Sequence, residues 1–313
     1  MTPRQPFVSY AQNGEDVVLA RALRPDERPG FWIDVGAGHP YDLSVTAAFA
    51  ERGWRGVNVE PHEPLHAALV RERPADVNLR VALGSEPGSA TLWVTERHLG
   101  LSTTTESVRE RLLLAGDHLT ARSVTKTTLA AICEEHARET TIDFLKIDVE
   151  GAEAEVLAGG DWERWRPRVV VIEAVLPETR IRSEAAWEHV LIDAGYECSL
   201  FDGLNLFYSR ADQPALAESL AVPANPSDAF VTIDDVRRRH ARDEARRLWK
   251  ARQAEVSALQ ARVHELEARL DASSTDLQVA QAELTRLRET KPFRITSAPR
   301  RLSRAVRQMT RRA

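Results

Sequence analysis

Carboxylate side chains stand at or near the ends of several apolar segments in the N-terminal part of the sequence. Asp34 lies near the end of one such segment and is followed at once by Gly36 and Gly38, and Glu60 closes the next segment, 26 positions after Asp34. A glycine-rich turn after a strand lets a ligand approach the backbone closely. An acid at the end of the next strand, roughly 20 residues on, can accept hydrogen bonds from both hydroxyls of a ribose. The pattern therefore predicts a cofactor that contains a ribose.

The same turn separates the classes of nucleotide cofactor. An acid at position 60 disfavours the 2′-phosphate of NADP, which leaves NAD, FAD and S-adenosylmethionine. A dinucleotide turn has the form G-x-G-x-x-G, and Tyr41 stands here in place of the third glycine. A Walker-type G-K-[ST] motif is also missing from the sequence. These features favour a cofactor with a ribose and an adenine but no phosphate.

Strand-like and helix-like segments alternate through this part of the chain. The apolar runs occupy residues 31–35, 56–60, 78–83, 142–149 and 168–175. Apolar strands that alternate with amphipathic helices predict an α/β fold in which both faces of a parallel sheet are covered. Only Asp-Gly separates 196–201 from 204–209, so we expect the sheet to end in an antiparallel hairpin. Such a sheet binds its ligand at the carboxyl ends of its strands.

Composition and charge divide the 313-residue chain into parts. No apolar run approaches the roughly 20 residues that span a bilayer, and the N-terminus has no signal-like pattern, so we expect a cytoplasmic protein. Residues 237–313 carry 20 Lys and Arg against 9 Asp and Glu, a net charge of +11, whereas residues 1–236 have a net charge of −16. This asymmetry and the segment VPANPSD (222–228) predict a boundary. The predicted parts are a globular domain (1–232), a helical coiled coil (233–290) and a basic tail (291–313).

Several sequence blocks together carry a family resemblance. They are SYAQNGEDVVL (9–19), the stretch from FWIDVGAGHPYD to VNVEP (31–61), TTLAAI (127–132), FLKIDVEGAEAEVLAGGDW (144–162) and FDGLNLFY (201–208). In these blocks, over roughly residues 7–232, the chain resembles the FkbM-type S-adenosylmethionine-dependent methyltransferases. The resemblance implies a Rossmann-like class I methyltransferase fold with a seven-stranded sheet. It also implies O-methylation of a hydroxyl, commonly on a sugar or a natural product.

The resemblance further implies which residues bind the cofactor. These are Asp34, Gly36, Ala37 and Gly38 at the methionine part, Glu60 and Pro61 at the ribose, and Glu15 in a segment that closes the pocket. Glu15 could instead simply begin a helix, because acids favour the positive end of the helix dipole. At the adenine, Leu83 and Gly84 offer no side-chain acceptor, which leaves Ser85 or backbone atoms. The hydroxyl-rich segment 97–107 is either a loop over the site or a solvated surface loop.

Asp148 and Glu150 are the candidate catalytic residues. They close the fourth strand in the sequence KIDVEGAE, next to where the methyl group should lie. A hydroxyl nucleophile must lose a proton, and a carboxylate within about 3 Å is the simplest acceptor. We therefore predict that Asp148 or Glu150 is the base, followed as candidates by Glu173 and His39. The alternative for Glu150 is to cap the helix that begins just after it.

No metal site is predicted from the sequence. Cys133 and Cys198 have no metal-like spacing to a histidine or to another cysteine, and we interpret both as packing residues. The histidines His39, His62 and His66 form no H-x-x-H pair. We expect His62 and His66 at the surface and His39 near the chemistry.

A heptad repeat follows the charge boundary. Apolar residues fill the a positions from Val256 to Leu284 and most d positions from Leu259 to Leu287, with Ser273 as the polar break. Five heptads of this kind predict a coiled coil. Because a lone helix would leave its apolar stripe exposed, we expect a homo-oligomer. The alternative is that the helix packs back on the globular domain.

The last segment, 291–313, is strongly basic. Nucleic acid could bind such a charge, but no aromatic stacking platform or groove-reading module accompanies it, so we predict no nucleic-acid partner. The stretch KPFRITSAPRRL (291–302) resembles a short tail that ends coiled-coil segments in bacterial glycan-assembly proteins. Apolar residues at helical spacing among the basic ones would suit peripheral contact with the inner surface of an anionic membrane.

These interpretations combine into one functional hypothesis. The protein is expected to be a cytoplasmic S-adenosylmethionine-dependent O-methyltransferase that acts on a sugar hydroxyl in a surface polysaccharide or glycoconjugate. Two alternatives remain open at this point. One is a natural-product O-methyltransferase, and the other is a non-catalytic cofactor-binding scaffold in glycan assembly.

Overall fold

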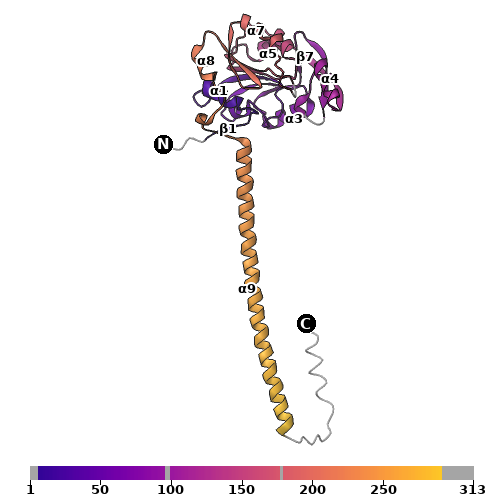
Figure 1. Cartoon of the computed structure of the whole chain (residues 1–313), viewed down its shortest axis with the longest axis vertical. Helices are drawn as coiled ribbons and strands as arrows, with labels where there is room; N and C mark the ends of the chain where they lie inside the picture. Colours follow the sequence, from indigo (N-terminus) through magenta and orange to yellow (C-terminus); the bar gives the residue numbers. More distant parts are fainter. Residues whose placement is uncertain (1–5, 96–98, 177–178, 291–313) are drawn as a thin grey trace. The chain divides into compact units, whose positions relative to one another are not determined.

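The computed structural model describes residues 6–95, 99–176 and 179–290 (Figure 1). By its internal contacts the chain separates into two compact units, Met1–Arg238 and Arg239–Ala313. The first unit holds the sheets and the short helices, and the second holds most of the long helix α9 (Ile233–Thr290). Within the described ranges, no helix is both long and apolar enough to cross a membrane.

A seven-stranded sheet forms the centre of the first unit, in the order β10-β11-β9-β8-β2-β3-β4. Its parallel strands are β2 (Phe31–Val35), β3 (Arg55–Val59), β4 (Val77–Leu79), β8 (Phe144–Ile147) and β9 (Val169–Glu173). The strands β10 (Tyr196–Phe201) and β11 (Asn205–Arg210) form an antiparallel hairpin, and β11 pairs with β9. The predicted α/β fold with a closing hairpin is therefore confirmed.

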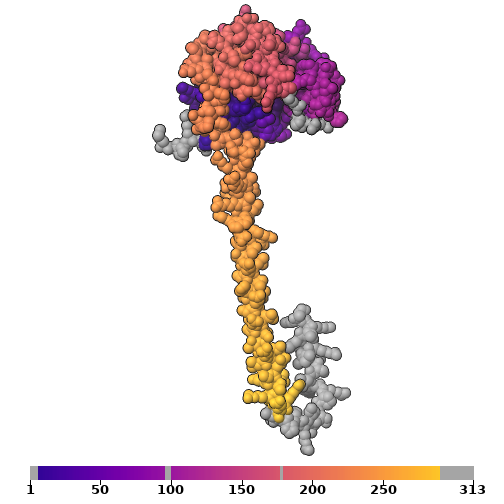
Figure 2. All heavy atoms as spheres, viewed as in Figure 1, coloured from indigo at the N-terminus to yellow at the C-terminus, as the bar shows by residue number. Residues whose placement is uncertain are grey.

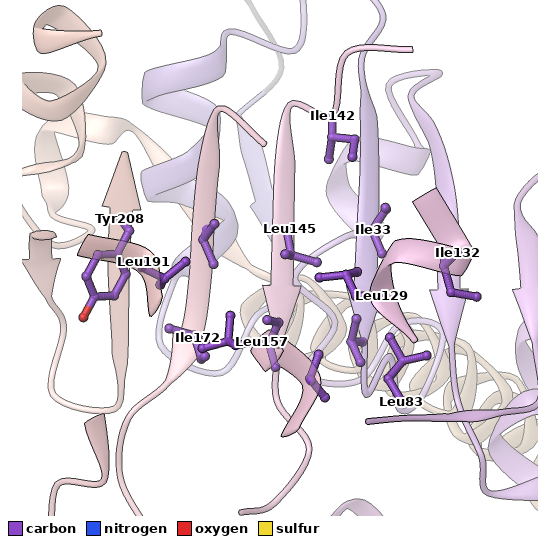
Figure 3. Close-up of a cluster of buried hydrophobic side chains, with 14 of the residues drawn as sticks. Ile33, Leu83, Leu129, Ile132, Ile142, Leu145, Leu157, Ile172, Leu191 and Tyr208 are labelled. Atoms are coloured by element: carbon purple, nitrogen blue, oxygen red, sulfur yellow. The ribbon is translucent and has the colours of Figure 1, made fainter. Parts of the chain in front are cut away.

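One face of this sheet is covered by three helices. Alternate strand side chains, among them Ile33, Leu145 and Ile172, pack with Leu129 and Leu157 in one buried cluster (Figure 3). The covering helices are α5 (Leu129–His136), α6 (Glu153–Ala158) and α7 (Glu188–Asp193). Because side chains alternate between faces along a strand, this cluster uses every second residue.

The intervening residues form a second core on the other face. Trp32, Phe144 and Val171 are buried there with Leu19 and Phe49. The helices on this side are α1 (Glu15–Leu23), α2 (Ala47–Ala50) and α8 (Pro214–Leu220). Burial on both faces explains why the strands appear in the sequence as almost continuous apolar runs.

A second, three-stranded sheet in the order β5-β7-β6 lies outside the main sheet. Its strands are β5 (Ala82–Leu83), β6 (Gly88–Thr95) and β7 (Leu119–Thr127), with η1 (Leu99–Leu101) and α4 (Glu106–Leu114) between β6 and β7. The single strand predicted at 78–83 is therefore wrong. Its pairing with β3 ends at Leu79, and Leu83 lies opposite Thr127 in the second sheet. Helix α3 (Glu63–Glu72) precedes β4 in the chain.

The N-terminal segment is joined to the residues just before α9. Strand β1 (Phe7–Ser9) pairs in parallel with β12 (Phe230–Thr232). Arg237, near the start of α9, donates a hydrogen bond to Asp42 at 2.7 Å. The first few residues of α9 thus belong to the globular unit, which extends to Arg238.

Helix α9 carries the predicted heptads on one continuous helix of 58 residues. Its a and d side chains are exposed, for example Leu259 at 61% and Leu270 at 70%. Figure 2 draws the atoms of this helix in orange to yellow. The long helix expected after the globular domain is confirmed. The predicted basic tail, 291–313, lies outside the described residues.

One buried carboxylate ties together the amino ends of three central strands. Asp143, which is 1% exposed, lies just before β8. It accepts hydrogen bonds from the Phe31 backbone N–H at 3.1 Å and from Arg168 Nη1 at 3.1 Å, at the starts of β2 and β9. Arg28 Nη1 donates to it at 3.2 Å. This network fixes the register of the strands that carry the site.

We expect Asp143→Ala to lower the free energy of unfolding by about 3 kcal/mol, because the variant leaves two arginines and a strand N–H without their acceptor. Urea unfolding followed by circular dichroism measures the change. Asp212→Asn is the matched control, since Asp212 is an exposed carboxylate whose partner is Arg210. An equal loss in both variants would contradict the special role of Asp143.

Candidate active site

A cavity of about 690 Å³ lies where the carboxyl ends of β2, β3, β8 and β9 meet. The ends of parallel strands fall at one edge of a sheet, so residues that follow different strands become neighbours. The predicted site residues that line the cavity are Gly36, Ala37, Gly38, Glu60, Pro61, Asp148 and Glu150. Asp34 and Glu15 are not part of this lining.

The turn after β2 requires both of its glycines. Gly36 (φ 78°) packs so closely against the end of β8 that a Cβ atom would lie 1.7 Å from the carbonyl oxygen of Asp148. Gly38 (φ 62°) lines the cavity and has no atom within 4 Å of the position its Cβ would take. Positive φ values favour glycine at both positions. The turn therefore presents bare backbone that a ligand can approach.

Glu60 holds this turn in place from the end of β3. Its carboxylate accepts hydrogen bonds from the backbone N–H of Gly38 at 2.8 Å and of His62 at 2.8 Å. Burial raises the pKa of Glu60 to about 7, although the hydrogen bonds from His62 and Gly38 oppose that rise. Glu60 is therefore a carboxylate whose protonation changes near neutral pH at the wall of the cavity.

Beneath the turn, Asp34 faces a buried lysine. Lys146 Nζ donates to the carbonyl oxygen of Gly36 at 2.9 Å and lies 3.5 Å from Asp34 and 3.2 Å from Asp148. Asp34, which is 1% exposed, also accepts a hydrogen bond from Thr46 Oγ1 at 3.1 Å. Asp34 is thus linked through Lys146 to the turn that contains Gly36.

Lys146 stays charged in spite of its burial. Burial alone would lower the pKa of Lys146, but the Asp148 and Asp34 carboxylates outweigh that effect and hold the pKa above its usual value. The sequence interpretation missed this residue. A lysine inside the apolar run 142–149 was the available signal, because lysine is almost never fully buried without a partner.

Three carboxylates gather on the other side of the cavity. One oxygen from each of Asp148, Glu150 and Glu173 lies within 4.8 Å of the others. Burial, with further contributions from Asp148 and Glu150, raises the pKa of Glu173 to about 10. The cluster therefore favours retaining a proton, because carboxylates this close do not all ionise together.

Within the described parts of the chain, these three side chains form the group whose oxygen atoms lie close enough together to hold a metal ion. Carboxylate oxygens are the ligands that Mg²⁺ and Ca²⁺ prefer. Such a group is invisible to a search for histidine and cysteine spacings, because Glu173 comes from a different strand. The protonated state of Glu173 offers another way to relieve the repulsion.

Glu15 lies outside the cavity and binds other parts of the protein. Its carboxylate accepts hydrogen bonds from the Asn13 backbone N–H at 2.7 Å and from Asn205 Nδ2 at 2.8 Å. It thereby links α1 to β11, while the neighbouring Gln12 lines the cavity. Burial raises the pKa of Glu15 to about 7.

The remaining wall of the cavity is apolar near the second sheet. It includes Val81, Ala82, Leu83, Leu65 and Leu92. The Ser85 hydroxyl, one of the expected adenine acceptors, donates to Glu155 at 2.6 Å, and Ser85 does not line the cavity. The wall therefore offers an apolar contact around Leu83.

Two histidine expectations have different outcomes. His39 lines the cavity, and its Nδ1 accepts backbone N–H groups from Tyr41 at 3.2 Å and Asp42 at 3.0 Å. His62, expected at the surface, is only 8% exposed. That expectation is wrong because position 62 directly precedes α3, where its ring is covered.

The segment predicted at 97–107 contributes the rim of the cavity. Gly100, Leu101, Ser102 and Thr104 line it, and residues 96–98 lie outside the described ranges. Of the two sequence interpretations for this segment, the loop over the site is the one that agrees with the structure.

Fold and cavity together define a class of protein. The sheet is mostly parallel with a reversed strand near one edge, and it carries a glycine turn after β2 and an acid after β3. The third glycine of a dinucleotide site is replaced by Tyr41. These are the features of a Rossmann-like nucleotide site built for a cofactor without a diphosphate, as in methyltransferases.

The family can be stated more closely. The model of the methyltransferase FkbM domain matches residues 34–198, which is more than half of the chain. The chain belongs to the FkbM methyltransferase family and is an S-adenosylmethionine-dependent methyltransferase. The resemblance predicted from the sequence blocks is thereby confirmed. No curated protein matches the chain.

The position and pKa of Glu60 lead to a binding prediction. An ionised carboxylate can accept hydrogen bonds from both ribose hydroxyls, whereas the protonated form accepts them poorly. Affinity for S-adenosylmethionine should therefore rise with pH through about 7 and then level off. Glu60→Gln should bind more weakly by about 1.5 to 3 kcal/mol, the range for hydrogen bonds to a charged group, and should lack that pH dependence.

Isothermal titration calorimetry across this pH range measures both effects. Glu63→Gln is the matched control, because Glu63 is the exposed glutamate nearest in sequence and pairs with Arg80. Circular dichroism checks that the variants are folded. An unchanged affinity in Glu60→Gln, or the same pH dependence as in the parent protein, would remove Glu60 from the ribose site.

Proposed function

We propose that this methyltransferase transfers its methyl group to a sugar hydroxyl in a surface polysaccharide or a related glycoconjugate. The observation that carries the proposal is that Asp148, Glu150 and Glu173 meet in the same cavity as the glycine turn. Such an arrangement supports oxygen as the nucleophile, because a hydroxyl needs a proton acceptor at the moment it is methylated.

The residues present fit S-adenosylmethionine. The bare turn at Gly36, Ala37 and Gly38 suits the methionine part, with Asp34 supporting it from below. Glu60 and Pro61 suit the ribose, and the apolar wall around Leu83 suits the adenine ring. A role of Glu15 in cofactor binding remains a prediction. Its hydrogen bonds with Asn13 and Asn205 indicate that it would act by holding the neighbouring segment that contains Gln12.

When bound, the cofactor supplies a methyl group activated by a sulfonium. The protein has two remaining tasks, to align the acceptor oxygen and to receive its proton. Alignment can contribute up to roughly 7 to 11 kcal/mol. A positioned base typically contributes on the order of 100- to 10,000-fold in rate.

Among the three carboxylates, we assign proton acceptance to Glu150. Burial and the neighbouring Asp148 and Glu150 carboxylates raise the pKa of Glu173, so Glu173 is the least suited of the three to accept a proton. Asp148 lies 3.2 Å from Lys146, and its negative charge balances that of the buried ammonium. In this proposal Asp148 orders the site, while Glu150 is the base.

The lining of the cavity supports a polyhydroxyl acceptor. The residues that line the same cavity as the carboxylates include several with hydrogen-bonding side chains, namely Gln12, His39, Asp42, Ser102 and Thr104. The cavity holds more acids than bases, which disfavours an anionic group beside the reacting hydroxyl. A neutral sugar residue satisfies both conditions better than a largely apolar natural product.

The experiment is a transfer assay with the full chain and methyl-labelled S-adenosylmethionine. Neutral glycans and an apolar phenolic or polyketide hydroxyl compound are offered as acceptors, and products are identified by mass spectrometry. Label on a sugar oxygen supports the proposal. Label on the natural product alone would assign the other acceptor class, and binding of cofactor without transfer to any acceptor would support a scaffold.

We expect Glu150→Gln to lower kcat by roughly 100-fold or more while the cofactor affinity stays within a few fold, because the group acts mainly in the transition state. Asp148→Asn should lower both kcat and cofactor affinity, since Lys146 loses a partner and the turn at Gly36 loosens. Steady-state kinetics and calorimetry on the same preparations separate these cases. Near-normal turnover in Glu150→Gln at saturating acceptor would contradict its assignment as the base.

Self-association through α9 is also part of the proposal. The exposed a and d side chains of Val256–Leu287 form an apolar stripe that a second copy can cover. Contact of the basic segment 291–313 with an anionic membrane surface remains a prediction from its composition. An oligomer would bring several such segments together and strengthen that contact.

The oligomer prediction is tested in the full chain. Replacing Leu259 and Leu266, both at d positions, by Glu should convert an oligomer into a monomer, because charges would enter the apolar seam. Replacing Ala261 and Ala268 by Glu adds the same charge on the outer f positions and should leave the oligomer intact. Multi-angle light scattering gives the mass of each, and a monomeric parent protein would refute the coiled coil.

A further inference from the structure

Glu150 has an unusual backbone conformation. Its φ is 55°, in the left-handed region, and it lies in the turn between β8 and α6. For a residue other than glycine this conformation is strained, and it persists only where the surroundings impose it. The contacts around the turn therefore decide where the Glu150 side chain points.

A buried threonine holds the carbonyl group of this residue. Thr103, which is fully buried, donates its Oγ1–H to the Glu150 carbonyl oxygen at 2.7 Å. The same Oγ1 accepts the backbone N–H of Thr105 at 3.0 Å. One hydroxyl thus joins the rim segment of the cavity to the turn that carries the proposed base.

Thr103 is itself fixed by the second sheet. Its backbone N–H and C=O pair with Trp93 of β6, at 3.0 Å and 2.8 Å. The Arg109 guanidinium lies 4.4 Å from the centre of the Trp93 ring. The threonine therefore has a rigid support that is independent of the main sheet.

The rest of the turn is enclosed as well. A Cβ atom on Gly151 would lie 2.7 Å from Val108 of α4, so this helix packs directly against the turn. The Glu153 carboxylate also accepts the backbone N–H groups of Gly151 at 3.1 Å and Val149 at 3.3 Å. The Glu150 carbonyl group lies between these two N–H groups in the chain, and its hydrogen bond comes from Thr103.

We infer that Thr103 is a positioning residue for Glu150. Its hydrogen bond holds the strained backbone so that the Glu150 carboxylate stays beside Asp148 and Glu173 at the cavity. The two neighbours of Thr103 in the sequence, Ser102 and Thr104, line the same cavity. The segment that would contact the acceptor therefore also positions the proposed base. This inference rests on the proposed role of Glu150.

The test compares Thr103→Val with Thr103→Ser in the full chain. Valine keeps the shape but removes the hydroxyl, and serine keeps the hydroxyl. We expect Thr103→Val to lower kcat by roughly 10- to 100-fold, the scale of a misplaced catalytic group, with cofactor affinity within a few fold of the parent. Thr103→Ser should restore most of the rate. Thr91→Val, at an exposed position on β6, is the matched control.

A double variant separates this inference from the proposed function. If Thr103 acts through Glu150, then Thr103→Val should cause little further loss in a Glu150→Gln background. The same loss in both backgrounds would overturn the inference, and so would a Thr103→Ser variant as slow as Thr103→Val. Near-normal turnover of Glu150→Gln alone would refute the assigned base, and a slow Thr103→Val would then reflect structure only.

Discussion

The buried ammonium of Lys146 is the interaction on which the rest of the site depends. An isolated charge at this depth would cost several kcal/mol, so Lys146 can be present only with its partners in place. Those partners are the carboxylates of Asp34 and Asp148 and the carbonyl group of Gly36. They come from two adjacent strands of the sheet, β2 and β8, and from the turn after β2. A single charged group therefore couples the cofactor turn to the strand end that carries the acids.

The site also carries more negative charge than its own residues neutralise. The cavity is lined by several glutamate and aspartate side chains, Glu60, Asp148, Glu150 and Glu173 among them. Within the described parts of the chain, Lys146 is the only lysine or arginine that lines it. The excess is partly relieved by protons, because the pKa of Glu173 is raised to about 10 by burial and by neighbouring carboxylates. Between pH 4.5 and about 10, the folded state keeps a proton on Glu173 that the unfolded chain releases. The contribution of Glu173 to the free energy of unfolding therefore decreases as the pH rises through this range. A cationic sulfonium in the cavity would offset the same excess.

The second sheet contributes to the cavity that lies at the carboxyl ends of the main-sheet strands. Strands β6 and β7 with α4 supply the rim of the cavity and the threonine that contacts the Glu150 turn. Strand β5 brings Leu83 to the apolar wall. The glycine turn and Glu60 thus come from the main sheet, whereas the opposite wall comes from the second.

Local patterns in the sequence determined the main elements and predicted the glycine turn and Glu60, which line the cavity. Apolar runs gave the central strands, Asp-Gly gave the hairpin, and the spacing of Asp34, Gly36 and Glu60 indicated the cofactor class, because each of these signals lies within one strand and its turn. Tertiary structure alone decided which distant side chains meet. Glu173 joins Asp148 and Glu150 only because β9 pairs with β8, and Lys146 finds Asp34 only because β8 pairs with β2. The split of 78–83 between two sheets and the burial of His62 were likewise decided by pairing and packing. Periodicity specifies a strand and its faces, but strand order and burial set its neighbours and, through them, the charges of the site.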